Sequence, residues 1–177
     1  MRIASNKLQD LITFYNHELS SVYEPNELTI VSQQVFKHYL GFSLTDIATK
    51  KNENLNQSDI IKLYDCCRDL KNNKPLQYIL GETEFYGLTF KVNSNVLIPR
   101  PETEELVELI LNDCKILTET TLDILDIGTG SGCIPISLKK NLPEANVSAV
   151  DISQEALQVA QQNAILNNTT VLFSCTN

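Results

Sequence analysis

Apolar side chains recur every three or four positions along the first 74 residues, which is the spacing of amphipathic helices. This pattern predicts a small helical bundle. Gly41 is expected to end one helix, Ser43 and Ser58 are expected to begin two others as N-caps, and the polar run "KNENLNQ" is interpreted as a connection. The predicted apolar stripes contain Leu8, Leu11, Ile12, Tyr15 and Leu19, then Leu28, Val31, Val35 and Tyr39, then Ile60, Tyr64, Cys67 and Leu70.

The pattern changes at residue 75, where short runs of strand-forming residues are separated by proline and glycine. The stretch "EFYGLTFKV" predicts a β-hairpin with Gly87 near its turn, so residues 75–98 are interpreted as a linker. A helix is expected from Pro101, because proline suits the first helical position and the glutamates that follow complement the helix dipole. Its predicted buried stripe consists of Leu106, Ile110, Cys114 and Leu117.

From Leu122 onward, apolar runs of strand length alternate with helical patterns. Alternation of this kind predicts a parallel sheet with right-handed crossovers. The fold class is therefore α/β, and the sequence contains the first half of a doubly wound sheet. The order is strand ("TLDILDI"), glycine-rich loop, helix ("CIPISLKKNL"), strand ("NVSAVDI"), helix ("SQEALQVAQQNAILN") and strand ("TTVLFS").

Composition and charge narrow the choice of function. The 42% apolar and 20% charged residues are typical of a globular protein, and the apolar runs stop well short of the roughly 18 residues that a membrane span needs. Five cysteines without metal-binding spacing predict no metal site and favour a reducing compartment, so a cytoplasmic location is expected. Residues 1–80 contain nine basic and nine acidic side chains, whereas residues 81–177 contain five and thirteen, so the net charges are 0 and −8. The acidic second half argues against direct nucleic-acid binding.

The stretch "LDIGTGSGCI" places Gly128, Gly130 and Gly132 between a predicted strand and a predicted helix, with Asp126 just before them. Dinucleotide-binding proteins have a Gly-x-Gly-x-x-Gly spacing instead, and a carboxylate at the loop would oppose their pyrophosphate. Asp151 ends the next strand, where a carboxylate can accept hydrogen bonds from both hydroxyls of a ribose. A free ribose with a cationic tail is the chemistry of S-adenosylmethionine, which is therefore the predicted cofactor.

The same residues also have simpler structural interpretations. A glycine-rich turn after a strand is often only a tight connection. Asp151 could cap the following helix, although Ser153 is better placed for that. The combination of strand, Asp126, loop, helix and Asp151 favours the cofactor site.

These residues resemble a known family. The loop "LDIGTGSGCI", the later "AVDIS", the segment "NVLIPRPETEELVE" and the approach "PLQYILGETEFYGLTFKV" are similar to the PrmC/HemK glutamine methyltransferases, which modify peptide chain release factors. The glycine motif is shared by many class I methyltransferases, whereas "LIPRPETE" at residues 97–104 is far more diagnostic. The resemblance covers nearly the whole chain.

The resemblance implies three parts and one reaction. Residues 1–74 would be a helical domain that helps to dock the release factor, residues 75–98 the hairpin linker, and residues 99–177 the N-terminal part of a Rossmann-like methyltransferase domain. The implied reaction is S-adenosylmethionine-dependent methylation of the glutamine side-chain amide in the Gly-Gly-Gln motif of class 1 release factors. The implied cofactor-binding residues are Gly128, Thr129, Gly130, Ser131 and Gly132, on the methionine and adenosine side, and Asp151, on the ribose.

The resemblance also implies a part that this sequence lacks. Family members position the accepting amide with an Asn-Pro-Pro-Tyr segment after the fourth strand. No two of the six prolines here are adjacent, so no catalytic residue is assigned and the chain is interpreted as a truncated form that is inactive alone. Its strand "TLDILDI" is expected to form an unpaired apolar edge that promotes self-association.

Other interpretations stay open. An adenine-N6 nucleic-acid methyltransferase uses a similar Asn/Asp-Pro-Pro-Tyr element, but the acidic second half disfavours it. A non-catalytic protein-binding module is the alternative of another class. The "RPETE" segment is interpreted either as a helix start whose acids complement the dipole or as part of the site.

Overall fold

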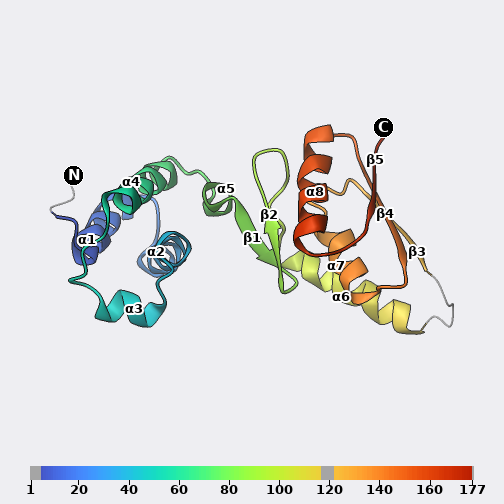
Figure 1. Cartoon of the computed structure of the whole chain (residues 1–177), viewed down its shortest axis with the longest axis horizontal. Helices are drawn as coiled ribbons and strands as arrows, with labels where there is room; N and C mark the ends of the chain where they lie inside the picture. The colour runs from blue at the N-terminus through green and yellow to red at the C-terminus, as the bar shows by residue number, and fades with distance from the viewer. Residues whose placement is uncertain (1–4, 117–121, 177) are drawn as a thin grey trace. The chain divides into compact units, whose positions relative to one another are not determined.

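The computed structural model describes residues 5–116 and 122–176. Contacts within the chain divide it into two compact units, Met1–Leu80 and Gly81–Asn177 (Figure 1). The sequence-based division at residues 74 and 98 stays a prediction. Within the described residues, no helix has both the length and the apolar content that crossing a bilayer requires.

The first unit is a helical bundle, as the apolar spacing predicts. The core is centred on Tyr15, which is fully buried and donates a hydrogen bond from its hydroxyl to the Leu63 carbonyl at 2.6 Å. Phe36 packs against the Tyr15 ring at a centroid distance of 5.2 Å. The helices are α1 (Leu8–Leu19), α2 (Pro25–Leu40), α3 (Leu44–Thr49), α4 (Gln57–Lys71) and α5 (Leu76–Leu80).

Two of the three predicted helix ends in this unit are confirmed. Gly41 ends α2 with a left-handed φ of 68°, and Ser43 begins α3 in a capping box with Asp46. The prediction of Ser58 as a cap is wrong, because Asn56 caps α4 by accepting from the Asp59 amide at 2.8 Å. Asn56 stands just before the first helical residue, where its side chain can reach the free amides, whereas Ser58 lies within the first turn.

The predicted polar connection is confirmed, whereas the segment of α5 differs from its sequence pattern. The polar connection at residues 51–57 is anchored by the buried Leu55, and its Glu53 carbonyl accepts from the first amide of α1 at 3.0 Å. The segment that forms α5 carries strand-forming residues, yet it is helical with Leu76 buried against the bundle core. Tertiary packing therefore overrides local strand propensity at α5.

The second unit begins with the predicted hairpin. Strands β1 (Glu82–Phe85) and β2 (Leu88–Lys91) pair antiparallel, and both turn residues have positive φ, 50° at Tyr86 and 70° at Gly87. This is the backbone of a type I′ turn, which matches the twist of the strands but strains a residue with a Cβ. The strained residue is held by α6 (Glu102–Ile116), because the Tyr86 amide donates to Glu104 Oε1 at 2.8 Å and its hydroxyl donates to Glu108.

The predicted buried stripe of α6 is confirmed only in part, and Leu106 is the residue that was wrongly placed in it. Val107 and Leu111 are buried, whereas Leu106 is 45% exposed and Ile110 and Cys114 are only partly buried. Leu117 lies outside the described residues. Val107 and Leu111 belong to the same buried cluster as Phe85 and Phe90 of the hairpin. This shared core decides which face of α6 is buried.

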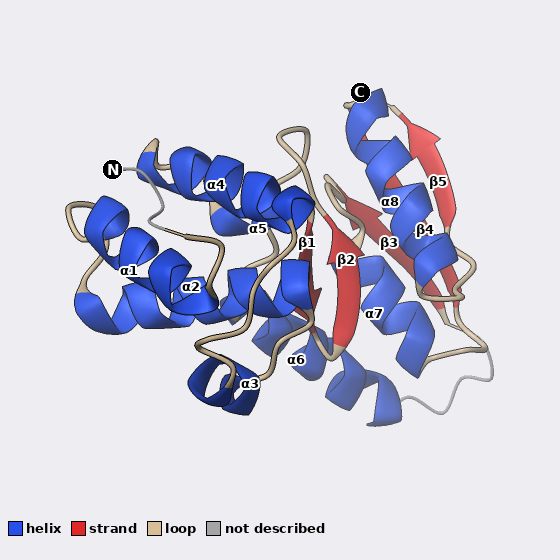
Figure 2. Ribbon diagram, turned by 60° about the vertical axis from the view of Figure 1, so that its left-hand side comes forward, coloured by secondary structure: helices blue, strands red, loops and turns tan. Residues whose placement is uncertain are grey.

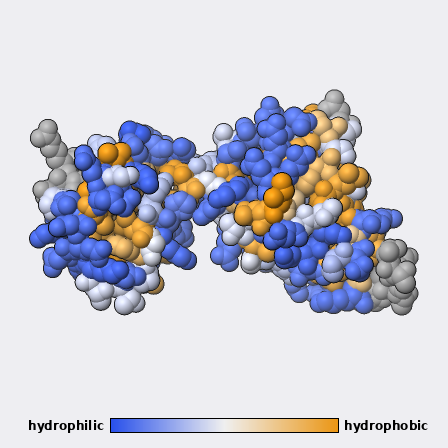
Figure 3. Space-filling model, viewed as in Figure 1, coloured by the Kyte–Doolittle hydropathy of each residue, from blue (hydrophilic) through white to orange (hydrophobic). Residues whose placement is uncertain are grey.

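The remaining elements form a parallel α/β layer, as predicted. The sheet order is β3-β4-β5, and β3 hydrogen-bonds to β4 alone among the described residues. Figure 2 shows α7 and α8 on one side of these strands. On the opposite face, which no described helix covers, Ile127 is 77% and Leu172 is 68% exposed. Figure 3 shows hydrophobic surface over the strands. The elements are β3 (Asp123–Ile127), α7 (Cys133–Asn141), β4 (Asn146–Asp151), α8 (Gln154–Leu166) and β5 (Leu172–Cys175).

Candidate functional site

A loop of alternating glycines joins β3 to α7. The φ angles of Gly128, Gly130 and Gly132 are 78°, 55° and 79°, a region that glycine enters without steric penalty. A Cβ at Gly128 or Gly130 would meet no heavy atom of the described residues within 4 Å. A Cβ at Gly132 would lie 3.0 Å from Ile136 Cδ1 and 3.1 Å from Ala160 Cβ. The first two glycines therefore leave open space, and the third lets the loop pack closely on α7 and α8.

The loop exposes some of its predicted site residues and buries others. Gly128 is exposed and Gly130 is partly exposed, whereas Thr129, Ser131 and Gly132 are buried. The Gly132 amide donates to the Thr129 carbonyl at 2.9 Å, which closes the turn. Open surface for a ligand is thus offered by Gly128 and Gly130, and contacts of the other three with a ligand stay a prediction.

Asp151 lies against this loop at the end of β4. Its Oδ2 accepts from the Gly130 amide at 2.8 Å, and its Oδ1 accepts from the Ser153 amide at 2.9 Å. Ser153 itself caps α8, because its hydroxyl accepts from the Ala156 amide at 3.1 Å, so the capping role belongs to Ser153 as expected. An ionised carboxylate offers about four acceptor positions. Two are used within the protein, and others are left for hydroxyl donors.

Asp126 is a second carboxylate beside the loop. It lies opposite Ala149 in the parallel register, two residues from Asp151 along β4, so both carboxylates are on the same face of the sheet. Its Oδ2 is buried without a hydrogen-bond partner among the described residues, and so is the Thr129 hydroxyl. Orphaned buried polar atoms are rare in folded proteins, and here they adjoin the open part of the loop.

Burial raises the pKa of Asp126, and the negative charge of Asp151 adds to the rise. The nearby Thr129 hydroxyl offsets only part of it, because the two side chains do not meet in hydrogen-bonding geometry. A raised pKa means that folding favours the protonated form. The stability of the ligand-free chain therefore falls as pH rises from the ordinary value of 3.8 through the raised folded pKa. At neutral pH, the ionised Asp126 lowers the free energy of unfolding, and a cationic ligand beside it would reduce that loss.

Asp126→Asn is accordingly expected to change stability and affinity in opposite directions. The free energy of unfolding at pH 7 should rise by roughly 0.5–1 kcal/mol, because a partly buried charge is removed. Affinity for S-adenosylhomocysteine should fall about tenfold, since one charge-assisted hydrogen bond is lost. Urea unfolding across pH and calorimetric titration measure the two effects. Asp123→Asn, at the exposed start of the same strand, is the control, and a fall in stability at Asp126 would contradict the prediction.

Cys133 follows the loop directly but does not provide a nucleophile. It is buried at the start of α7, and burial raises the pKa of its thiol to about 11. The reactive form of cysteine is the thiolate, which is scarce at neutral pH when the pKa is that high. Cys133 is therefore assigned no chemical role.

One residue that contacts the glycine loop is not among those predicted from the sequence. Asn163 on α8 is fully buried and donates from Nδ2 to the Ser131 carbonyl at 2.9 Å. The available signal is an amide side chain on a face of α8 that otherwise carries Ala156, Val159 and Ala160. A buried polar residue on an apolar face has to be hydrogen-bonded, so its position alone indicates a partner.

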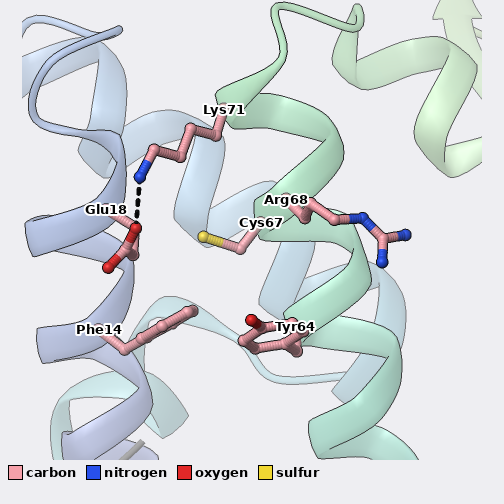
Figure 4. Close-up of a pocket in the computed structure, with 6 residues that line it drawn as sticks. All are labelled: Phe14, Glu18, Tyr64, Cys67, Arg68 and Lys71. Atoms are coloured by element: carbon pink, nitrogen blue, oxygen red, sulfur yellow. Dashed lines mark hydrogen bonds and ion pairs between the residues drawn. The ribbon is translucent and has the colours of Figure 1, made fainter. Parts of the chain in front are cut away.

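A separate hollow of about 220 Å³ lies in the helical unit between α1 and α4 (Figure 4). Phe14 and Tyr64 stack at its base with ring centroids 5.6 Å apart. Lys71 and Glu18 form an ion pair of 2.6 Å above them. Tyr64, expected on a buried stripe, is 46% exposed here, so this part of the stripe is surface rather than core.

Comparison with known proteins matches both units. The family described as PrmC N-terminal domain matches residues 10–81, and the family described as Methyltransferase small domain matches residues 105–177. A release factor glutamine methyltransferase of Flavobacterium psychrophilum is 44% identical over 162 residues, which are 91% of this chain and 57% of that protein. A release factor glutamine methyltransferase of Streptococcus pneumoniae is 44% identical over 89% of this chain and 55% of that protein. Among solved structures, a Pyrococcus abyssi tRNA (uracil-54, C5)-methyltransferase in complex with S-adenosyl-L-homocysteine has 22% identity and a TM-score of 0.45, covering 54% of this chain and 23% of that chain.

The parallel sheet, the glycine loop after β3 and the match to the methyltransferase small domain define the first half of a Rossmann-like methyltransferase. Methyltransferases of this fold depend on S-adenosylmethionine. The chain belongs to the release factor glutamine methyltransferase family, and it spans about half the length of the curated relatives that it matches.

Proposed function

We propose that the glycine loop binds S-adenosylmethionine. The proposal rests on two carboxylates that lie beside the open loop. Asp151 accepts a hydrogen bond from the Gly130 amide at 2.8 Å. Asp126 has a buried oxygen without a hydrogen-bond partner among the described residues. Asp126 would accept from the ammonium group of the cofactor, and Asp151 would accept from the ribose hydroxyls. Thr129, Ser131 and Gly132 hold the loop in shape from the buried side.

We further propose that the cofactor serves methylation of a glutamine side-chain amide in a class 1 peptide chain release factor. The relatives' names support this acceptor, and the net charge of −8 over residues 81–177 opposes a nucleic-acid backbone in its place. The cofactor supplies an electrophilic methyl group. The residues of this chain bind and orient it, whereas an acceptor-positioning Asn-Pro-Pro-Tyr is not among the 177 residues. The chain alone is therefore expected to bind cofactor without turnover.

The helical unit is proposed to dock the release factor. The hollow in Figure 4 offers an aromatic floor from Phe14 and Tyr64 and a polar rim from Glu18, Arg68 and Lys71, a combination suited to a protein surface. The reaction is proposed to occur in the cytoplasm, where translation terminates, and the free thiols of all five cysteines are compatible with a reducing compartment.

Calorimetric titration of the 177-residue chain with S-adenosylhomocysteine tests the cofactor proposal, and NADH is the matched negative ligand. Binding of the first and not of the second is expected. A folded chain that binds neither overturns the proposal. Titration with a class 1 release factor tests the docking proposal separately, and a radiolabelled methyl assay tests the expected lack of turnover.

The free edge of β3 is proposed to make the chain self-associate. Leu125 and Ile127 are 59% and 77% exposed on this edge strand, which is the kind of surface that pairs with another chain. Light scattering is expected to show dimers or larger species that dissociate in Ile127→Lys, because a charge on an edge strand opposes pairing. Ile165→Lys on α8, at the same exposed fraction of 77%, is the control and should have no effect. A monodisperse monomer of the unmodified chain would refute the proposal.

A further inference from the structure

The outer edge of the hairpin is bonded by two asparagine side chains of α8. In the register of β1 and β2, Lys91 lies opposite Glu82 and Thr89 lies opposite Glu84. The Asn163 amide group accepts from the Lys91 amide at 2.6 Å and donates to the Lys91 carbonyl at 3.0 Å. Asn167, one helical turn later, donates to the Thr89 carbonyl at 2.9 Å. The two amides thus take the place that a third strand would occupy along β2.

Asn163 also makes a bond that Asn167 does not. The second N–H of its Nδ2 donates to the Ser131 carbonyl in the glycine loop at 2.9 Å. Both donors and the acceptor oxygen of this side chain are therefore used, and the residue is fully buried. Asn163 joins β2 to the glycine loop, whereas the second donor bond of Asn167 goes to the Asn163 carbonyl within α8 at 3.0 Å.

The bond fixes one peptide group of the loop from both sides. The peptide that links Ser131 to Gly132 has its carbonyl bonded by Asn163 and its amide bonded by the Thr129 carbonyl at 2.9 Å. Glycines on either side of Ser131 would otherwise let this peptide rotate. Without Asn163, the buried Ser131 carbonyl would lose its partner, and the loop would be expected to rearrange toward water.

We propose that Asn163 is a positioning residue that holds the glycine loop in its cofactor-binding shape and couples that shape to the hairpin. This inference rests on the proposed binding of S-adenosylmethionine by the loop. The physical effect is preorganisation, because a loop already fixed before binding loses less conformational freedom when the ligand arrives. Asn167 supports the hairpin alone, so the two asparagines form a matched pair.

The test compares Asn163→Ala with Asn167→Ala in the 177-residue chain. Both variants remove a hydrogen bond to β2, and both are expected to unfold at lower urea concentration than the unmodified chain. Affinity for S-adenosylhomocysteine, measured by calorimetric titration, is expected to fall about tenfold in Asn163→Ala and less than about twofold in Asn167→Ala. If Asn163→Ala does not fold, Asn163→Ser replaces it, since a hydroxyl retains one donor in a smaller side chain.

Amide hydrogen exchange of the ligand-free chain gives a second measurement that is independent of the cofactor. The Gly132 amide is expected to exchange about tenfold faster in Asn163→Ala than in Asn167→Ala, because only the first variant frees the Ser131–Gly132 peptide. Equal effects of the two variants on exchange and affinity would overturn the inference, since they would show general destabilisation. If the unmodified chain binds no S-adenosylhomocysteine, the proposed function fails, and the Gly132 exchange rates still decide whether Asn163 holds the loop.

Discussion

Asp151→Ala is expected to weaken the binding of S-adenosylhomocysteine by about 100-fold, because two hydroxyl donors each lose a bond to a carboxylate worth about 1.5 kcal/mol. The loop is affected as well, since Asp151 also accepts from the Gly130 amide at 2.8 Å. Asp151→Asn keeps an oxygen for that amide but removes the charge, so an intermediate loss of roughly tenfold is expected. Calorimetric titration at constant ionic strength measures all three affinities.

The matched control for Asp151 is Asp123→Ala. Asp123 lies at the opposite end of the sheet, at the start of β3, and its removal changes the net charge by the same amount. An unchanged affinity in Asp123→Ala excludes a long-range charge effect. If Asp151→Ala binds S-adenosylhomocysteine as tightly as the unmodified chain does, Asp151 has no part in the cofactor site.

Gly132→Ala is expected to lower the free energy of unfolding by about 2–5 kcal/mol, from a left-handed backbone cost of about 1–2 kcal/mol and an overpacking cost of about 1–3 kcal/mol. The added Cβ would lie 3.1 Å from Ala160 Cβ and 3.0 Å from Ile136 Cδ1. Gly128→Ala is the matched control, because its φ of 78° is nearly the same as the 79° of Gly132 and its Cβ would meet open space. It should lose only the backbone part, about 1–2 kcal/mol.

Urea unfolding of the two alanine variants measures this difference. The variant Ala160→Gly offers a further check, because it removes Ala160 Cβ, one of the two side-chain atoms that crowd the new Cβ. In the double variant, Gly132→Ala should lose less stability than it does alone, apart from the separate cost of a helical glycine. Equal losses for Gly132→Ala and Gly128→Ala would show that packing between the loop and α8 contributes little.

The elements with strong local signals could be predicted from the sequence. The parallel α/β order from β3 to β5 follows from alternating apolar runs, and the hairpin follows from strand-forming residues around Gly87. The contact between the glycine loop and Asp151 could also be expected, because the carboxyl ends of neighbouring parallel strands meet at one edge of the sheet. These features depend on residues close together in the chain or on the geometry of parallel strands.

The predictions that were wrong or missing concern packing between segments that are far apart in the sequence. Leu106 was wrongly placed in the stripe of α6 because it and Val107 are adjacent apolar residues, and only the hairpin core decides that Val107 is the buried one. Asn163 could not be assigned a role, because its partners Ser131 and Lys91 lie 32 and 72 positions away. A periodic pattern shows which residues can be buried, but not which partner a buried amide meets.

The face of the sheet that none of the described helices covers exposes apolar side chains close to the glycine loop. Leu125, Ile127 and Leu172 are apolar on strands that already bury Val147 and Ala149 on the other face, the composition of a sheet sandwiched between two layers. Full burial of each would contribute about 1.5–3 kcal/mol. Because β3 leads directly into the glycine loop, a polypeptide layer that covers this face is expected to reduce fluctuations of the loop, which is the proposed cofactor site. By thermodynamic reciprocity, bound cofactor would then strengthen attachment of that layer.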